Sequence, residues 1–504
     1  LSFGIKLTNT FPVDVTREEL PSEEMYMSGR SLLPLSVELA RRVAAEFEGT
    51  LRISYSGGAD AHNIRELYAA GIWPITMATN VLKPGGYERF SQIAGLLGGS
   101  ERVEKVDAAA LAALEEAITA NPIYHKPIKP AKSHKIDAEL PLMSCFTAPC
   151  RTGCPIQQDI PAYLSAVDEG RLVDALNIVM ERNALPHITG NLCPHPCGVN
   201  CERSFYEPEG ARIRESKLIA AKGGFDEVLA QIKAATPAPI AGARGKKVAI
   251  VGGGAAGLST AFFLTRAGAE ATIFEATNKL GGVPRQTIPE FRIPDADIQA
   301  DIDLCLSYGA KVEYNHEVTD VAELKAAGYT DVVMCIGAWE PGRKALEYGD
   351  ELDALEFLCA AKRGDDLSSL GSDIVVIGGG NTAMDCARVA ERLPGVESVR
   401  IAYRRTRRYM PAEEYELDEA LAEGVEFCEL LAPKGLADGV LSCERMELGE
   451  PDATGRRSVV AIGERVELPA TAVICAVGER IKDGLYKQAG VELDHRGRPA
   501  AGCA

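Results

Sequence analysis

Two glycine-rich turns decide the fold of this chain: VAIVGGGAAG at residues 248–257 and IVVIGGGNTA at residues 374–383. Each consists of an apolar run, a glycine-rich turn and a helix-forming stretch, which is the order of a dinucleotide-binding βα unit. One such motif is weak evidence. Two on one chain, each with a suitable acceptor downstream, predict an α/β flavoprotein with two Rossmann-type domains.

The first turn has the features of an FAD site. Gly252 permits the tight turn, Gly254 lets the backbone approach a pyrophosphate, and Gly257 lets the helix pack on the strand. The N-terminus of the following helix offers free N–H groups to the phosphates. The next strand ends at Glu275, where a carboxylate can accept a hydrogen bond from a ribose hydroxyl. The alternative is a nucleotide-free fold with an unrelated acid.

Two further features support a flavin at the first turn. A second close-approach turn, typical of flavin enzymes, follows at Leu280, Gly281 and Gly282. A later strand is expected within DVVMCIGAW, residues 331–339, and ends at Gly337. TAVICAVG, residues 471–478, is its counterpart after the second turn.

The second turn predicts NADPH. Gly378, Gly380 and Ala383 form its G-x-G-x-x-A, with Asn381 and Thr382 at the start of the helix. The following strand ends at Arg404 and Arg405, where the first unit has an acid, and Arg407 and Arg408 lie just beyond. A 2′-phosphate favours a guanidinium at this position, whereas an acid would select NAD. The alternative is a solvated basic loop.

Six of the 14 cysteines form two groups ahead of the first turn: Cys145, Cys150 and Cys154, then Cys193, Cys197 and Cys201. Close spacing and a proline after Cys154 favour [4Fe–4S] clusters in a reducing compartment. Structural zinc usually uses C-x2-C pairs, which neither group contains. Six cysteines do not fill two four-ligand clusters, so one or two clusters are expected.

Composition and charge limit the functional class. The 504 residues leave room for several domains. A net charge of −18 argues against nucleic acid as a partner. No apolar run is long enough for a membrane-spanning helix, and no secretory signal opens the chain, so a cytoplasmic protein is expected. The chain starts at Leu1 and ends at Ala504 within what look like structural elements, so we expect a fragment.

The order of patterns predicts the domains. A βαβαβ run suggests part of a TIM barrel at 1–100, before a linker at 101–140. A helical iron–sulfur domain is expected at 141–235. The FAD-binding domain is expected at 246–370, the NADPH-binding domain at 371–470, and a truncated return to the FAD-binding domain at 471–504.

Three motifs carry a family resemblance: IPEFRIP (288–294), GGGNTAMD (378–385) and RRYMPAEE (407–414). With the cysteine groups, they resemble the glutamate synthase small-subunit family and the NADPH-oxidising half of dihydropyrimidine dehydrogenase. KLTNTFPV, ISYSGGADA and WPITMATNVLKPGGY, within the first 100 residues, resemble the closing strands of a dihydroorotate-dehydrogenase-like barrel. A barrel ahead of such a module resembles the YgfK type of selenate reductase flavoprotein subunit.

The resemblance implies how the cysteines would divide. One cluster would take Cys145, Cys150 and Cys201, and the other Cys154, Cys193 and Cys197. Relatives have a further cysteine where this chain has Leu142, and a Glu or Gln where it has Lys217. Glu215, Glu209 or His195 would substitute, or one cluster would be missing. The family's last flavin-contacting turn would follow Ala504.

The resemblance also raises FMN binding in the barrel. Gly57, Gly58 and Thr79 stand where related barrels bind the FMN phosphate, and Lys6 and Asn9 stand on a strand that lines the flavin in relatives. The other interpretation is a barrel kept as a structural or docking unit.

We therefore expect an NADPH-dependent oxidoreductase with FAD and iron–sulfur clusters. Hydride would pass from NADPH to flavin N5, and single electrons to the clusters and then to a partner protein or domain, such as a molybdenum enzyme or a ferredoxin. No catalytic side chain is assigned. Glu413 and Glu414 would position the nicotinamide or begin a charged helix. The alternatives are a glutamate-synthase-like or ferredoxin-coupled subunit and a non-catalytic scaffold.

Overall fold

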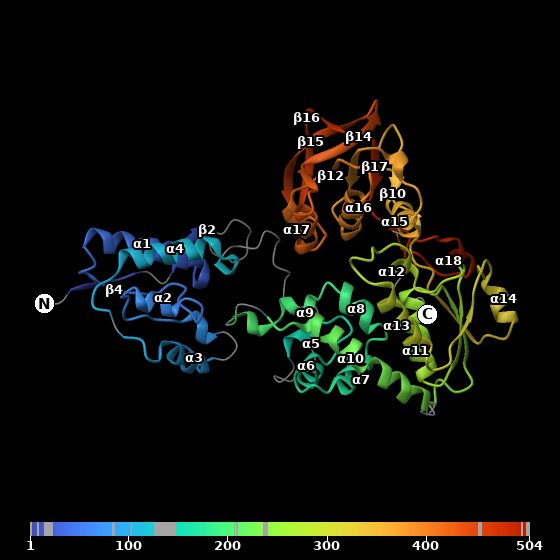
Figure 1. Cartoon of the computed structure of the whole chain (residues 1–504), viewed down its shortest axis with the longest axis horizontal. Coiled ribbons are helices and arrows are strands. Elements are labelled where there is room, and N and C mark those ends of the chain that lie inside the picture. The colour runs from blue at the N-terminus through green and yellow to red at the C-terminus, as the bar shows by residue number, and fades with distance from the viewer. Residues whose placement is uncertain are drawn as a thin grey trace. The chain divides into compact units, whose positions relative to one another are not determined.

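The computed structural model describes residues 3–7, 10–14, 24–82, 86–101, 103–124, 148–205, 207, 210–234, 240–451, 456–494 and 497–499. The chain forms two compact units (Figure 1). The first comprises Leu1–Cys150 and Cys197–Arg212, and the second comprises Arg151–Pro196 and Ile213–Ala504.

Short parallel strands form the centre of the first unit. β1 (Gly4–Lys6) pairs with β4 (Arg52–Ser54), and a parallel bridge joins Tyr55 to Ile75. Strands that follow one another in parallel need helical crossovers, as in the repeating unit of a TIM barrel. The remaining elements of this part are β2 (Phe11–Asp14), β3 (Glu24–Met27), η1 (Gly29–Leu32), α1 (Leu33–Glu46), α2 (Ile64–Ala69), η2 (Thr79–Leu82), α3 (Glu88–Leu97) and η3 (Pro122–Tyr124).

A helix within the expected linker belongs to the core of the first unit. α4 (Ala108–Ala120) starts at Asp107, whose Oδ1 accepts hydrogen bonds from the amides of Ala109 and Ala110 at 2.8 and 3.0 Å. Its apolar face, Leu111, Leu114 and Ile118, is buried with residues of α1, beside which it lies in Figure 1. The chain from Val106 to Ile118 therefore contributes to a packed core, while 125–140 lies outside the described residues.

Helices, most of them short, form the described part of the span expected to hold the clusters. Their bounds are α5 (Pro149–Gly153), α6 (Ile160–Asp168), α7 (Leu172–Met180), α8 (Pro186–Leu192), α9 (Pro196–Val199), η4 (Glu202–Phe205) and α10 (Ile213–Ala234). In the second unit, α8 is fastened to α13 (Asp295–Leu306) by the buried Asp301. The Asp301 carboxylate accepts hydrogen bonds from the amides of His187 and Ile188 at 3.0 and 2.7 Å, and lies 2.8 Å from His187 Nδ1.

The first nucleotide domain has a parallel sheet in the order β7-β6-β5-β8. Its central strand, β5 (Lys247–Val251), is buried over its last four residues, as expected of a strand covered on both faces. The other elements are α11 (Ala255–Arg266), β6 (Glu270–Phe274), α12 (Gly282–Gln286), β7 (Lys311–Glu313), α14 (Val321–Ala326) and β8 (Asp331–Met334).

The second nucleotide domain has a parallel sheet in the order β10-β17-β11-β12-β13. It takes in β10 (Leu352–Asp353) and β17 (Ala472–Cys475), so it begins before residue 371 and continues past residue 470. The other elements are α15 (Ala354–Arg363), η5 (Ser368–Leu370), β11 (Asp373–Ile377), α16 (Asn381–Glu391), β12 (Ser398–Tyr403), η6 (Arg407–Tyr409), α17 (Glu414–Ala422) and β13 (Glu426–Glu429). An antiparallel sheet of β14 (Leu431–Ala437), β15 (Val440–Pro451) and β16 (Arg457–Pro469) follows β13.

Two crossing segments join the nucleotide domains. β9 (Glu340–Pro341) leaves the first domain after β8, and β18 (Glu479–Arg480) returns from the second after β17. The two strands pair antiparallel. After β18 the chain rejoins the first domain, because Leu485 in α18 (Gly484–Gln488) packs against the cluster containing Ala249 and Val251. No described helix combines the length and the apolar character needed to cross a membrane.

The Asp301 contact predicts a large effect on stability. Asp301→Ala leaves two amides and His187 without their buried acceptor, so the free energy of unfolding of the second unit should fall by about 3–5 kcal/mol. Urea unfolding followed by circular dichroism measures this. Asp331→Ala, which removes an exposed pair with Lys246, is the matched control and should cost less than about 1 kcal/mol. Equal effects of both variants would contradict the prediction.

Candidate functional site

The first glycine turn is tightly packed at two positions and open at one. Gly252 has φ +103°, and a Cβ there would lie 2.4 Å from the carbonyl oxygen of Cys335. A Cβ on Gly257 would lie 1.9 Å from the Gly252 oxygen. Gly254, which precedes α11, has an ordinary φ of −78°, and the nearest atom to its Cβ would be the Cα of Gly282 at 3.6 Å. Packing therefore requires the first and third glycines, whereas a Cβ on Gly254, at the helix N-terminus, would make only an ordinary contact.

Glu275 lies at this turn, as the sequence predicts. It follows β6 directly and is buried. Its Oε2 accepts the Gly253 amide at 2.8 Å, and its Oε1 accepts the Thr277 amide at 2.9 Å. The carboxylate is thus held in one orientation beside the turn.

The second close-approach turn packs on the first. Gly281 has φ +117°, and its amide donates to the Gly253 carbonyl at 2.9 Å. Gly282 has φ +55°, and a Cβ there would lie 2.7 Å from the Gly254 Cα. Leu280 is buried. Gly337, with φ +70°, lies two residues beyond the Cys335 that covers Gly252.

The second nucleotide turn repeats this construction. Gly378 has φ +149°, and a Cβ there would lie 2.4 Å from the Ala476 carbonyl and 3.2 Å from the Cβ of buried Ala383. Gly380 precedes α16 with an ordinary φ of −95°, and a Cβ there would meet nothing within 4 Å. Neither the backbone nor the packing of the described residues explains this glycine, which instead leaves room for a ligand. Asn381 begins α16, followed by Thr382, and its Oδ1 accepts the Glu413 amide at 3.0 Å.

Arg404 and Glu275 occupy equivalent places, because each directly follows the second strand of its βα unit. Arg404 is exposed. Arg405 is partly buried, and its Nε donates to the Arg457 carbonyl at 3.1 Å. Its Nη1 is buried and has no hydrogen-bond partner in the described part of the chain. Burial, then Arg456 and Arg404, lower the pKa of Arg405, so like charges gather here around an unpaired donor.

The other arginines of this segment are differently engaged. Arg407 forms ion pairs with Glu414 at 3.2 Å and Asp418 at 2.6 Å. Arg408 lies 6.0 Å from the Tyr409 ring centroid. Glu414 thus fits the interpretation of a charged helix start. Arg456 was not predicted, although the basic pair at 456–457 was visible in the sequence.

The cysteines divide between the two units. Cys150, Cys197 and Cys201 belong to the first, and Cys154 and Cys193 to the second. Backbone amides approach two of the sulfurs, since Ala211 N–H donates to Cys201 Sγ and His195 N–H donates to Cys193 Sγ, both at 3.4 Å. Amide donors to sulfur suit cluster ligands, whose potentials depend on such bonds.

Part of the predicted cluster region lies outside the described residues. This applies to the candidate ligands Cys145 and Glu209, and to Leu142, which stands where relatives have a cysteine. In the described ranges, no group of three or more His, Cys, Asp or Glu side chains could hold a metal ion. The predicted division of the cysteines between two clusters therefore stays a prediction.

The candidate substitute ligands differ in their surroundings. His195 has φ +37°, and its Nδ1 is buried without a hydrogen-bond partner in the part of the chain that the structure describes. Burial, Arg214 and Lys217 lower the pKa of His195. Lys217 is buried on α10, whereas Glu215 is exposed there.

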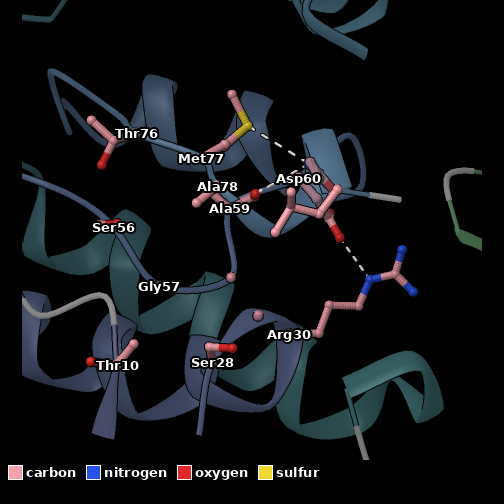
Figure 2. A pocket seen from close by; sticks show the side chains of 14 residues that line it. Thr10, Ser28, Arg30, Ser56, Gly57, Ala59, Asp60, Thr76, Met77 and Ala78 are labelled. Atoms are coloured by element: carbon pink, nitrogen blue, oxygen red, sulfur yellow. Dashed lines mark hydrogen bonds and ion pairs between the residues drawn. The ribbon is translucent and has the colours of Figure 1, made fainter. Parts of the chain in front are cut away.

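The barrel unit contains a pocket of about 180 Å³ at the predicted FMN position (Figure 2). Gly57 and Gly58, with φ +124° and +89°, line it, together with the hydroxyl side chains of Thr10, Ser28, Ser56 and Thr76. Arg30 also lines it, but its Nε lies 2.6 Å from Asp60 Oδ2, so its charge is already compensated.

Other residues of the FMN prediction contribute less to this pocket. Lys6 is exposed and lies outside the lining, and Asn9 lies outside the described residues. Ala78 and Asn80, on either side of Thr79, do line the pocket. FMN binding remains a prediction.

Three known families match successive parts of the chain. Residues 1–126 match oxidoreductase YgfK, N-terminal TIM-barrel domain. Residues 132–218 match dihydropyrimidine dehydrogenase domain II, 4Fe-4S cluster. Residues 246–501 match pyridine nucleotide-disulphide oxidoreductase. These matches confirm the predicted fold class and the predicted cofactors FAD, NADPH and [4Fe–4S].

Three relatives show the extent of the similarity. The oxidoreductase YgfK of Escherichia coli K12 is 43% identical over 99% of this chain and 48% of its own length. The NADPH-Fe(3+) oxidoreductase subunit beta of Geobacter sulfurreducens is 35% identical over 70% of this chain and 53% of its own. The glutamate synthase [NADPH] small chain of Escherichia coli K12 is 33% identical over 71% of this chain and 79% of its own.

The chain spans about half the length of YgfK and of the Geobacter subunit. It belongs to the pyridine nucleotide-disulphide oxidoreductases, as a YgfK-type FAD and iron–sulfur NAD(P)H oxidoreductase homologous to the small chain of glutamate synthase.

Proposed function

We propose that this chain is the electron-input module of a larger oxidoreductase, in which NADPH binds at the second nucleotide turn and FAD at the first. A bound FAD would supply the chemistry of hydride acceptance from NADPH and of release of single electrons, which iron–sulfur clusters require. The residues of the chain bind and orient these groups, and electrons leave toward a partner protein or domain.

The observation that carries this proposal is the contrast between Glu275 and Arg404. Both follow the second strand of a βα unit, where the adenosine ribose is recognised. Glu275 is a fixed acceptor for a ribose hydroxyl. Arg404, which is exposed, offers donors to a 2′-phosphate, and the guanidinium of Arg405 beside it adds positive charge. The two turns therefore favour different nucleotides.

The open glycines support a pyrophosphate at each turn. Gly254 and Gly380 precede the helices α11 and α16, where the free N–H groups of a helix N-terminus attract phosphate. Neither glycine has a positive φ. A Cβ on Gly380 would meet nothing within 4 Å, and a Cβ on Gly254 would make an ordinary contact, at 3.6 Å, with the Gly282 Cα.

A partner is supported by the names of the relatives. The Geobacter relative is named as a subunit beta and the glutamate synthase relative as a small chain, so each works in an assembly. For this chain we propose an electron-accepting protein or domain, with a molybdenum enzyme of the selenate reductase type as the first candidate. A ferredoxin is the second candidate.

The proposal is tested by anaerobic purification with iron and flavin quantified, followed by titration with NADPH and with NADH. We expect bound flavin that is bleached at far lower NADPH than NADH concentration. About eight irons per chain would indicate two clusters, and about four would indicate one. Absence of flavin, or bleaching by NADH alone, would contradict the proposal.

The open position of Gly380 predicts a substitution that separates binding from folding. Gly380→Ala adds a methyl group where the pyrophosphate would lie, so the Kd for NADP+ should rise at least about tenfold. Stability should stay within about 1 kcal/mol, because φ is ordinary and the Cβ meets nothing. Gly378→Ala is the control, and should destabilise by about 1–3 kcal/mol through its strained φ and the clash with Ala476. Unchanged NADP+ binding in Gly380→Ala would place the nucleotide elsewhere.

The arginine pair predicts the choice between the two nicotinamide nucleotides. Arg404→Ala with Arg405→Ala should weaken NADPH by about 10- to 150-fold, the value of one or two charge-assisted hydrogen bonds. NADH, which lacks the 2′-phosphate, should be affected less than about threefold by the same change. Flavin-bleaching titrations with both nucleotides measure this. Arg407→Ala should have little effect on the preference for NADPH over NADH, because Arg407 is paired with Glu414 and Asp418.

A further inference from the structure

The segment 288–294 of the first nucleotide domain docks on the helices of the second. Lys362 Nζ, on α15, donates to the Ile288 carbonyl at 2.5 Å. The ring of Phe291 is contacted by Arg388 of α16 and by Arg392, the residue after α16. Their guanidinium carbons lie 4.5 and 4.2 Å from the ring centroid.

Arg292 makes the deepest of these contacts. Its Nη1 lies 2.5 Å from Asp385 Oδ1 on α16, and its Nη2 lies 2.5 Å from Glu416 Oε1 on α17. The exposed fractions of the three side chains are 11%, 8% and 0%. One guanidinium thus bridges two carboxylates on two helices of the other domain.

The first of these helices, α16, begins at the second nucleotide turn, and the residues just before the second, α17, are hydrogen-bonded to that turn. Asp385 lies one helical turn after Asn381, the first residue of α16. Asn381 in turn accepts the amide of Glu413, the residue before α17. Arg292 therefore contacts the same structure that presents the nucleotide site.

A buried charged bridge of this kind specifies geometry more than stability. A planar guanidinium, whose N–H groups point in fixed directions, can pair with two carboxylates only in a narrow range of orientations. Removing water from three charges offsets much of their attraction, so such a group adds little net stability. Domains within one chain are otherwise expected to move relative to each other. The bridge thus selects one docked orientation.

We propose that Arg292, Asp385 and Glu416 are positioning residues, which hold the second nucleotide domain in the orientation that brings NADPH to the flavin. This inference rests on the proposed function of the two turns. Positioning has a large effect on rate, because a misplacement of about 1 Å can cost on the order of a hundredfold.

The charge state of Asp385 gives the bridge a pH dependence. Asp385 faces Arg292, Arg388 and Glu416, and burial raises the pKa of Asp385 to about 6. Below a pH of about 6, this carboxyl is therefore mostly protonated and neutral. The charged pair with Arg292 is therefore complete above pH 6 and is lost as pH falls through 6.

The test uses the anaerobic full chain with bound flavin and compares Arg292→Gln, Asp385→Asn and the double variant with wild type. Arg400→Gln is the control, since its partners Asp373 and Glu426 lie in the same domain as Arg400. The measurements are the Kd for NADP+, the rate of flavin bleaching at saturating NADPH from pH 5 to 8, and hydrogen exchange of α16 and α17.

We expect the bridge variants to bind NADP+ within about twofold of wild type, while flavin bleaching slows at least about tenfold. Amide hydrogen exchange should become faster in residues 288–294, α16 and α17, because the contact between these segments is lost. The double variant should be no slower than the slower single variant, because both changes break one contact. Bleaching by wild type should slow below pH 6, and Asp385→Asn should remove that transition.

Different failures would have different meanings. If NADPH bleaches the flavin of the wild type, and the bridge variants bleach at a rate within about twofold of the wild type, the positioning role alone is overturned. A flavin-containing wild type that NADPH does not bleach would overturn the proposed function and this inference with it. If Arg292→Gln loses flavin on purification, Asp385→Asn, which keeps the side-chain size, decides the question by the same readouts.

Discussion

Each nucleotide domain depends on a close approach between a turn glycine and the carbonyl that follows a neighbouring strand. Gly252 lies against Cys335, and Gly378 against Ala476, with the same 2.4 Å distance to an added Cβ. No side chain can be accommodated there without moving a strand of the sheet. This contact determines where the backbone turns, and thereby where the helices α11 and α16 direct their N-terminal amides. The acceptors at Glu275 and Arg404 are then placed by the parallel pairing of β5 with β6 and of β11 with β12.

The two domains are joined by contacts of different kinds. The backbone crosses twice through β9 and β18, which pair with each other. Side chains from 288–294 add a cation–π contact and a buried charged bridge to the helices of the second domain. The helical segment is fastened to the first domain through Asp301. An apolar cluster also spans the junction of the helical segment with the first nucleotide domain, since Leu185 and Ile188 are buried together with Ile298 and Ile302. The apolar cluster that contains Ile374 and Ile401, by contrast, lies within the second nucleotide domain.

Much of the fold could be predicted, because its main signals are local. Glycine turns, buried strand runs and strand-end acceptors all lie within short windows of sequence, and parallel strands bring the acceptors to the turn edge of the sheet. The spacing of Leu111, Leu114 and Ile118 was also a signal for a packed helix, which the nearby proline and lysine run obscured. The contacts of Arg292 could not be predicted, since its partners lie 93 and 124 positions further along the chain. The share of β10 and β17 in the second sheet likewise depends on pairing between distant short strands.

The paired crossing segments give the chain a particular topology. The chain leaves the first domain at β9 and returns at β18, and these strands are hydrogen-bonded neighbours. The second nucleotide domain is therefore an insertion whose two ends lie side by side. Removing it would interrupt none of the strands β5 to β8 and would leave a gap short enough for a tight turn to close. Such an arrangement allows recombination to exchange the whole nucleotide-selecting domain, with its sheet and its arginines, as a single cassette.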